Sequence, residues 1–182
     1  MTRRRTTGLD PITKKRKTTA KPQPRTKQSF TLEVSIVSGP MSESFVRKHN
    51  VISRTIGIRG DQTLADLHRA IFDAFDREEE HLYEFQIGGR RPMDPNARRY
   101  GLAMDAPFGE SDPTGHAART TLDSLGLETG DVFGYWFDFG DDWWHQIAVL
   151  AIAESTPRGR LPKVTRRVGK SPPQYVNWEE EE

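Results

Sequence analysis

The stretch YWFDFGDDWWHQI, residues 135–147, places aromatic side chains along two segments that flank Gly140, Asp141 and Asp142. Alternation of side-chain character is typical of strands, and Gly and Asp are typical of the turns between strands. We therefore expect a hairpin with strands at about 132–139 and 143–152. The hairpin predicts a fold more sharply than it predicts a chemistry.

The loop length of this hairpin decides which side chains meet. A two-residue loop at Asp141 and Asp142 would place Asp138 opposite His145. Directly opposed side chains have Cβ atoms about 4.5–5.5 Å apart, close enough for a carboxylate to contact an imidazole. Asp tolerates the positive φ of a tight turn less well than Gly, so Asp142 favours a longer loop in which this pairing is lost.

Two interpretations of the polar residues remain open. In the first, His145, Asp138 and His81 form a small hydrolytic or metal site, in which a carboxylate orients an imidazole. In the second, Asp138 and Asp141 bond turn amides and His145 is an ordinary strand residue. The second is favoured because the chain has no H-E-x-x-H or G-x-S-x-G motif. We therefore assign no catalytic residue, no metal ligand and no cofactor.

The aromatic residues of the hairpin fall on both of its faces. The alternate positions from Phe133 to Phe139 are expected to point into the core, where each buries a large apolar area. The residues Trp136, Trp143 and Trp144 allow two outcomes: both faces are covered, or one of them is a binding surface.

The rest of the ordered region supplies further strands and one helix. Thr63 and Asp66 are spaced as the first residues of a capped helix, and apolar residues follow at helical spacing. The expected elements are strands at 31–37, 52–58 and 82–87, a helix at 63–76 and a short helical turn at 121–127. This order predicts an α+β domain over residues 29–154: a β-grasp-like (ubiquitin-like) mixed sheet of about five strands with one main helix and a long loop at 89–120.

Three segments of the chain resemble motifs of one known family. They are Thr63-Leu64-Ala65-Asp66-Leu67-His68, similar to T-L-x-x-L-H, His81-Leu82-Tyr83-Glu84-Phe85, similar to H-L-H-x-F, and the hairpin, similar to Y-D-F-G-D-G-W-x-H-x-I. The family is the Ri-plasmid ORF-3-like domain family, also called insertion-element passenger TnpR-like, which has no established activity. The resemblance covers about residues 30–177 and implies seven signature residues: Arg54, His81, Asp138, Gly140, Asp141, Trp143 and His145.

The chain also departs from the family pattern at four positions. Ser53 stands where the family has Trp, Tyr83 where it has a second His, Asp142 where it has Gly, and Ser171 where many members have Cys. A metal or thiol role for that second His or that Cys is therefore not expected here.

Charge divides the chain into three blocks, although its net charge is only +1. Residues 1–28 carry ten Lys or Arg against one acidic residue, residues 29–154 carry 11 basic and 21 acidic residues, and residues 155–182 carry six basic residues before an acidic end at 179–182. The first block holds two dense clusters: Arg3, Arg4, Arg5 and Lys14, Lys15, Arg16, Lys17. With little to bury, this basic arm is expected to be disordered, and it can contact nucleic acid, solubilise the chain or fold back on the acidic domain.

Composition limits the remaining possibilities. The chain has no cysteine, which excludes a disulfide framework and a thiolate metal site. Its longest apolar run, Ile147–Ala153, is far shorter than the roughly 20 residues of a membrane helix. We expect a soluble, cytoplasmic protein without a membrane partner, and the residues leave its oligomeric state open. The favoured function is a non-enzymatic binding or adaptor module with nucleic acid or a protein as its partner; the alternative is a small metal-assisted hydrolase that uses His145, Asp138 and His81.

Overall fold

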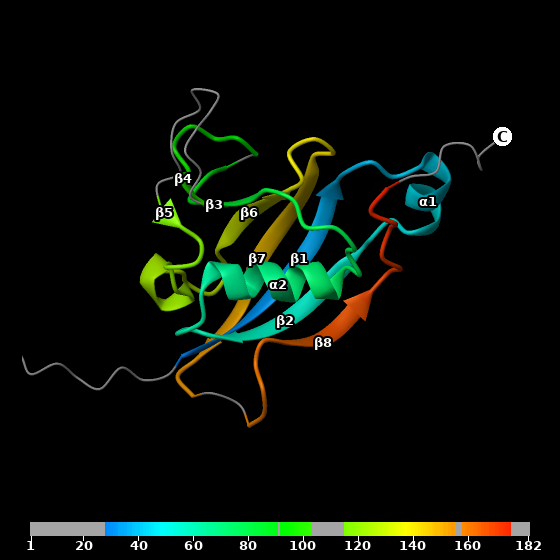
Figure 1. The fold of residues 1–182 in the computed structure, drawn as a ribbon. Helices are drawn as coiled ribbons and strands as arrows, with labels where there is room; N and C mark the ends of the chain where they lie inside the picture. Colours follow the sequence, from blue (N-terminus) through cyan, green and yellow to red (C-terminus); the bar gives the residue numbers. More distant parts are fainter. Residues whose placement is uncertain (1–27, 91, 103–114, 156–157, 176–182) are drawn as a thin grey trace, which may run out of the picture.

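The computed structural model describes residues 28–90, 92–102, 115–155 and 158–175. Within them, one mixed sheet holds eight strands in the order β5-β4-β3-β6-β7-β1-β2-β8 (Figure 1). The strands are β1 (Ser29–Ser38), β2 (Ser53–Arg59), β3 (Tyr83–Ile87), β4 (Arg98–Gly101), β5 (Gly115–His116), β6 (Val132–Phe137), β7 (Trp143–Ala153) and β8 (Lys163–Val168). The helices are α1 (Glu43–Lys48), α2 (Leu64–Ala74) and the 3-10 helix η1 (Leu122–Leu125).

The expected β-grasp-like sheet of about five strands with one main helix is wrong. The described residues form eight strands and two α-helices, and β7 lies between β1 and β6, antiparallel to both. Alternation identifies a strand but not its neighbours, because pairing partners lie far apart along the chain. Strands β4 and β5 form inside the segment expected to be a long loop, and β8 forms beyond the expected end of the domain at residue 154.

The individual elements of the expected core are confirmed. The five expected strands correspond to β1, β2, β3, β6 and β7, and the expected helix corresponds to α2. A capping box begins α2: Thr63 Oγ1 accepts from the Asp66 amide at 3.1 Å, and the Thr63 amide donates to Asp66 Oδ2 at 2.9 Å. These two bonds satisfy amides that the first helical turn would leave unpaired.

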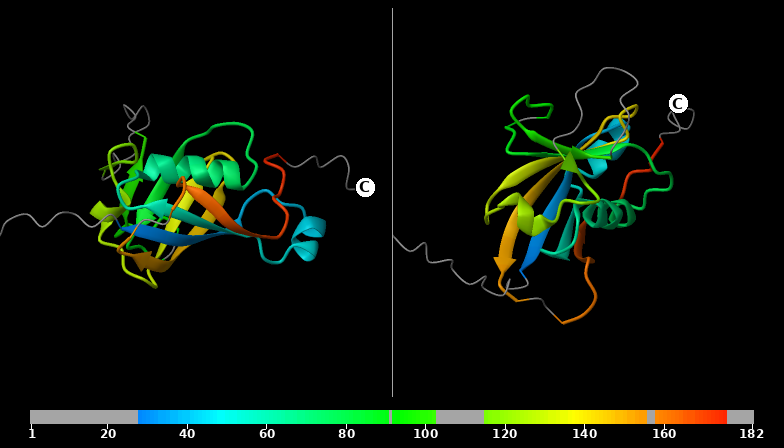
Figure 2. Two further views of the ribbon diagram at one scale, coloured as in Figure 1. Left: turned by 90° about the horizontal axis from the view of Figure 1, so that it is seen from below. Right: turned by 60° about the vertical axis from the view of Figure 1, so that its left-hand side comes forward.

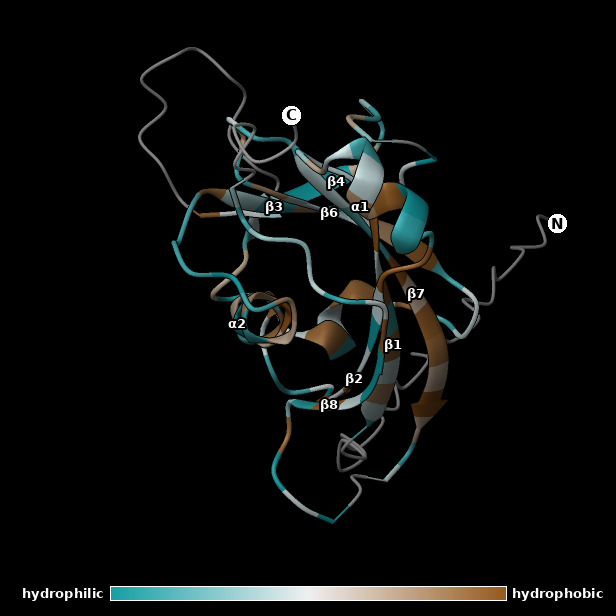
Figure 3. Cartoon of the chain, turned by 90° about the vertical axis from the view of Figure 1, so that its right-hand side faces the viewer, coloured by the Kyte–Doolittle hydropathy of each residue, from teal (hydrophilic) through white to brown (hydrophobic). Residues whose placement is uncertain are grey.

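The sheet curls around α2 and encloses the core. In Figure 3 the helix is seen nearly along its axis, with β3 and β6 on one side, β7 and β1 on the next, and β2 and β8 on the third. Figure 2 shows the same helix crossing the concave face of the sheet. Leu67 and Ile71 of α2 are buried against the inward-facing side chains of the strands, among them Leu32, Ile56 and Phe85. Each such side chain contributes about 1.5–3 kcal/mol by leaving water.

One short helix was not expected. Helix α1 lies in the polar connection between the first two strands, where Ser42 Oγ accepts from the amide of Phe45 at 3.2 Å. Six residues are too few to show helical periodicity in the sequence. No described helix is long and apolar enough to cross a membrane.

Three expectations concern residues outside the described ranges. They are the disordered basic arm, apart from Gln28, the middle of the long loop at 103–114, and the acidic end at 179–182.

Candidate functional site

The loop between β6 and β7 comprises five residues, Asp138–Asp142, and not two. Tyr135, rather than Asp138, therefore lies opposite His145. Asp138 and Asp142 have φ angles of 56° and 53°, in the left-handed region that Asp adopts more readily than most residues. The longer loop absorbs the two positive φ angles, and it removes the Asp138–His145 pairing that a two-residue turn would have produced.

The Asp138 side chain closes this loop and reaches the segment just before β3. Its Oδ1 accepts hydrogen bonds from the amides of Gly140 at 3.1 Å and Asp141 at 3.3 Å. Its Oδ2 lies 3.4 Å from Nε2 of His81, which also lies 2.8 Å from the Tyr175 hydroxyl. Gly140 and Asp141 thus take part through their backbone amides, while His81 is held by a carboxylate and a phenol.

His145 lies in the core, away from this pair. It is 3% exposed, it packs against the rings of Phe75 and Tyr135, and neither ring nitrogen has a hydrogen bond of good geometry among the described residues. Burial, assisted by the charge of Arg77, lowers the pKa of His145 to about 3. The imidazole is therefore neutral at physiological pH.

The geometry separates the three residues of the hydrolase alternative. His81 and Asp138 meet, but His145 stands in the core. In the ranges that the structure describes, no group of three or more His, Cys, Asp or Glu side chains is placed to hold a metal ion. A metal-assisted hydrolase would therefore lack the third ligand that this alternative assigned to it.

Trp143 is a core residue whose ring packs against a buried cation. Its side chain is fully buried, and the guanidinium carbon of Arg77 lies 3.7 Å from the centre of a Trp143 ring. Burial lowers the pKa of Arg77 to about 10, so the group still carries its charge at pH 7. Neither terminal nitrogen of Arg77 has a hydrogen-bond partner among the described residues, and the charged form is favoured by the aromatic face and by the charge of Asp138.

The other two Trp residues of the hairpin lie on the outer face of the sheet. Trp136 and Trp144 stack with ring centres 4.8 Å apart, and Trp136 also stacks on Phe139 at 4.0 Å. Phe139 lies in the loop and does not continue the inward row that was expected to reach it. The Trp136 indole donates to Asp142 Oδ1 at 2.9 Å, so this group is a partly buried cap on the hairpin.

The signature residue Arg54 ties α2 to the C-terminal segment. Its side chain is 2% exposed and lies over the ring of Phe75 at 4.8 Å. Its guanidinium donates to the carbonyls of Ala74, Ser53, Val168 and Gly169 and to the hydroxyl of Ser171. Burial, followed by the charge of Arg167, lowers the pKa of Arg54. With its donors used inside the protein, Arg54 has a structural role.

A buried relay that the sequence analysis missed runs from the core to the surface. The Tyr135 hydroxyl lies 2.8 Å from Nδ1 of His68, and Nε2 of His68 lies 2.9 Å from Oε2 of Glu80. Burial lowers the pKa of His68 more than Glu80 raises it, and burial raises the pKa of Tyr135 far above its usual value. A neutral His68 therefore donates its Nε2–H to the carboxylate and accepts from the Tyr135 hydroxyl.

The sequence did contain a signal for His68. This residue occupies the same apolar stripe of the helix as Leu64, Leu67 and Ile71, all of which are buried. A polar side chain on such a stripe has to find partners inside the protein. Glu80 and Tyr135 could not be named as those partners, because they lie 12 and 67 residues away along the chain.

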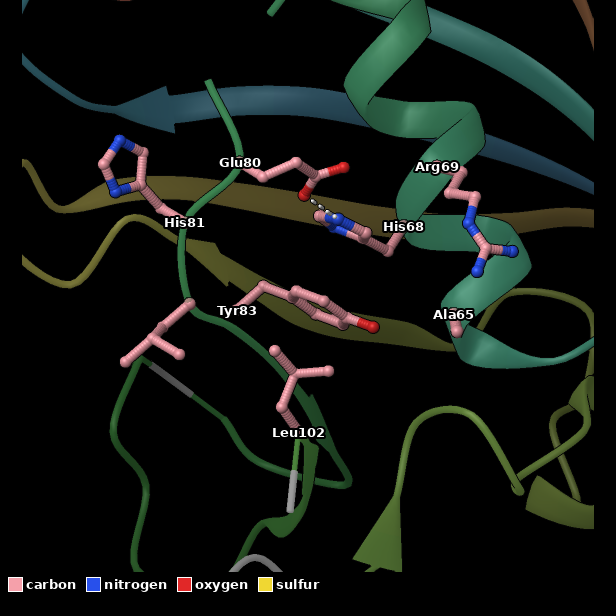
Figure 4. Close-up of a pocket in the computed structure, with 8 residues that line it drawn as sticks. Ala65, His68, Arg69, Glu80, His81, Tyr83 and Leu102 are labelled. Carbon is pink, nitrogen blue, oxygen red and sulfur yellow. Dashed lines mark hydrogen bonds and ion pairs between the residues drawn. The ribbon is translucent and has the colours of Figure 1, made fainter. Parts of the chain in front are cut away.

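The three motif segments converge in the fold. His68, from the first segment, stacks on Tyr83, from the second, with ring centres 3.6 Å apart and nearly parallel planes. His81, also from the second, contacts Asp138 of the hairpin. Beside these residues, a cavity of about 550 Å³ is lined by Ala65, His68, Arg69, Glu80, His81, Leu82, Tyr83 and Leu102 (Figure 4).

A second candidate surface lies at the far edge of the sheet. Among the described strands β8 has a neighbour, β2, on one side only. Six exposed basic residues lie on β8 and beside it: Arg158, Arg160, Lys163, Arg166, Arg167 and Lys170. Residues 155–178 contain no acidic residue, so this edge is basic on a domain that is otherwise acidic. The clusters of the basic arm, Arg3–Arg5 and Lys14–Lys17, lie outside the described residues.

Comparison with known proteins agrees with the fold and the motifs. A crystal structure of a protein of unknown function from Methanosarcina mazei Go1 is similar, with a TM-score of 0.61 and 21% sequence identity over 81% of this chain and 73% of that one. At this identity the likeness concerns the fold. No curated protein matches the chain. The family model described as plasmid pRiA4b ORF-3-like protein matches residues 44–179, and the chain therefore belongs to the plasmid pRiA4b ORF-3-like family.

Proposed function

We propose that this chain is a non-enzymatic, cytoplasmic binding module that contacts nucleic acid through its basic arm and through the basic edge at β8. The observation that carries this proposal is the row of basic residues at the β8 edge. Lys163 pairs with Gly57 and Arg166 with Thr55, so both basic residues lie on β8, the last strand of the sheet. Both are exposed. Lys and Arg side chains that neutralise phosphates release counterions, which is the main source of affinity for nucleic acid.

One basic residue of the edge is held by the protein and is not counted among the phosphate contacts. Arg167 donates to the carbonyl of Ala74 at the end of α2 and lies 3.8 Å from the carboxylate of Asp76. Lys163 and Arg166 have no such partner among the described residues, and Arg158, Arg160 and Lys170 are exposed as well. The edge thus offers several cations but, among the described residues, no element that reads bases. This supports contact with the phosphate backbone of nucleic acid and not recognition of a base sequence.

The chemistry of the relay supports a role without catalysis. Tyr135, His68 and Glu80 have the order hydroxyl, imidazole, carboxylate, which is the order of a nucleophilic triad. The hydroxyl, however, is in the core: Tyr135 is 1% exposed and keeps its proton. A nucleophile has to reach the substrate, so this relay serves structure and positioning.

The test is a comparison of DNA affinities at one fixed salt concentration. Fluorescence anisotropy of a labelled duplex is measured with the full chain, with K163Q/R166Q, and with a variant in which Lys14, Lys15, Arg16 and Lys17 are Gln. We expect each variant to bind about tenfold more weakly or worse. The matched control is R47Q/K48Q on α1, which removes two basic residues elsewhere and should bind like the unmodified chain. Failure of the full chain to bind, or equal affinities for all four proteins, would overturn the proposal.

A further inference from the structure

The cavity between α2 and β3 has a polar mouth and an apolar wall. Its wall is formed by Ala65, Leu82, Leu102 and the ring of Tyr83. Figure 4 shows Glu80 above the His68 ring, Tyr83 below it, and His81 pointing away from both. A volume of about 550 Å³ is within the range of small-molecule sites.

The relay fixes one oxygen of Glu80 and leaves the other for a ligand. Oε2 accepts from His68, whereas Oε1 accepts no hydrogen bond from a described residue. The Glu80 side chain is 62% exposed, so it stands at the mouth of the cavity and not inside the core. Because His68 is neutral, its hydrogen bond orients the carboxylate without cancelling the charge.

The other charges around the cavity are already balanced. The charge of Arg69 is paired, because its guanidinium lies 3.4 Å from the carboxylate of Asp66, and Nε2 of His81 contacts the carboxylate of Asp138 at 3.4 Å. Glu80 is therefore the lining group whose charge has no counter-charge among the described residues. Complementarity of charge calls for a cation at this position.

The apolar wall of the cavity is rigid at Tyr83 and suits an apolar stem. Tyr83 is 5% exposed, and its ring is fixed by the stack on His68 at 3.6 Å, with 5° between the planes. Leu82 and Leu102 add aliphatic surface beside it. The methylene stems of alkylammonium and alkylguanidinium groups pack on such surfaces while the charged head stays near water.

We propose that this cavity binds a ligand that carries an ammonium or guanidinium group on an aliphatic stem, with the cation at Glu80 and the stem against Tyr83, Leu82 and Leu102. The site shares no residue with the basic edge, and Glu80 would repel a phosphate backbone. Two sources can present this chemistry: a free small molecule, or a Lys or Arg side chain of a polypeptide, such as those of the chain's own basic arm.

The test uses N-acetyl-arginine methylamide and N-acetyl-lysine methylamide as probes and N-acetyl-glutamate methylamide as the probe of opposite charge. Each is titrated into the ¹⁵N-labelled full chain and followed by amide chemical shifts. We expect the cationic probes to shift the amides of Ala65, Arg69 and Glu80, and the substitution E80Q to weaken their binding about tenfold. The control E43Q removes an exposed carboxylate on α1 and should bind the probes as the unmodified chain does.

Three results would overturn the proposal: absence of shifts at these amides, equal affinity of E80Q and the unmodified chain, or tighter binding of the anionic probe. Since Glu80 is mostly exposed, E80Q is expected to fold, and its spectrum checks this directly. The source is separated by repeating the titration with Arg3–Arg5 and Lys14–Lys17 replaced by Gln. Tighter probe binding in that variant assigns the site to the arm, and unchanged binding assigns it to a separate molecule.

Discussion

The carboxylate of Asp138 lies 3.4 Å from Nε2 of His81, across the gap between the β6–β7 loop and the start of β3. The same carboxylate accepts from the amides of Gly140 and Asp141. One side chain thus closes a five-residue loop and fixes the His residue that borders the α2–β3 cavity. Asp138 therefore connects the hairpin motif to the cavity.

Replacement of Asp138 separates its charge from its hydrogen bonds. D138A removes the acceptor of the two loop amides and places Ala at a φ of 56°, so we expect a loss of about 1–3 kcal/mol in the free energy of unfolding. D138N keeps an oxygen for the amides and tolerates this φ, so it should lose less than half as much. Urea denaturation at neutral pH measures both, and equal losses would show that the capping bonds do not matter.

Arg54 is expected to be one of the most sensitive positions in the chain. R54M removes the bonds that Arg54 donates to four carbonyls and the Ser171 hydroxyl, although the Ala74 carbonyl keeps Arg167, and we expect it to cost about 3–5 kcal/mol in the free energy of unfolding. R54K keeps the charge but loses the planar fork, and should fall between R54M and the unmodified chain. The control R47A removes an exposed Arg and should cost less than about 0.5 kcal/mol. An R54M protein as stable as R47A would contradict the structural role.

His145 makes the protein sensitive to acid. Its pKa is about 3 in the folded chain and about 6.5 in the unfolded chain, so between these two pH values the unfolded chain binds a proton that the folded chain does not. Stability is therefore unaffected above pH 7 and falls as the pH drops from about 6.5 towards 3. Between pH 7 and pH 5 this group alone should cost about 2 kcal/mol. In H145L that part of the pH dependence should disappear; an unchanged difference between pH 7 and pH 5 would refute the burial of a neutral His145.

Arg77 offers a test of a buried charge whose two terminal nitrogens have no hydrogen-bond partner among the described residues. R77M keeps a long, flexible side chain over Trp143 and removes both the charge and its unpaired N–H groups. Since desolvation outweighs the contact with the ring, we expect the free energy of unfolding to rise by about 1 kcal/mol. Thermal or urea denaturation measures the change. A loss of stability in R77M would mean that the cation–π contact outweighs the cost of burial.

The sequence predicted elements better than their arrangement. The strands of the hairpin and the capped helix follow from local periodicity, and both are confirmed. The sheet order does not, because β7 pairs with β1 more than a hundred residues away. The loop Asp138–Asp142 lies between these cases: Asp142 indicated that the turn is longer than two residues, but no local pattern fixed the register that places Tyr135 opposite His145.

The candidate site was also predictable only in part, because local motifs select residues but do not show which distant residues they meet. His81 and Asp138 were selected from motifs, and the structure brings them together. His145 was selected with them, but the side-chain period of two places it on the inner face once Tyr135 is its partner. Glu80 and Tyr135 belong to the site only because they contact His68, and no spacing in the sequence predicts these contacts.

The most direct test of the proposed function is the salt dependence of DNA affinity. A plot of the logarithm of the binding constant against the logarithm of salt concentration has a slope of about −0.9 for each phosphate neutralised on duplex DNA. We expect the full chain to bind with a steep negative slope, and K163Q/R166Q to lower its magnitude by about 2. Identical slopes for the two proteins, or no binding by the full chain at low salt, would contradict the account.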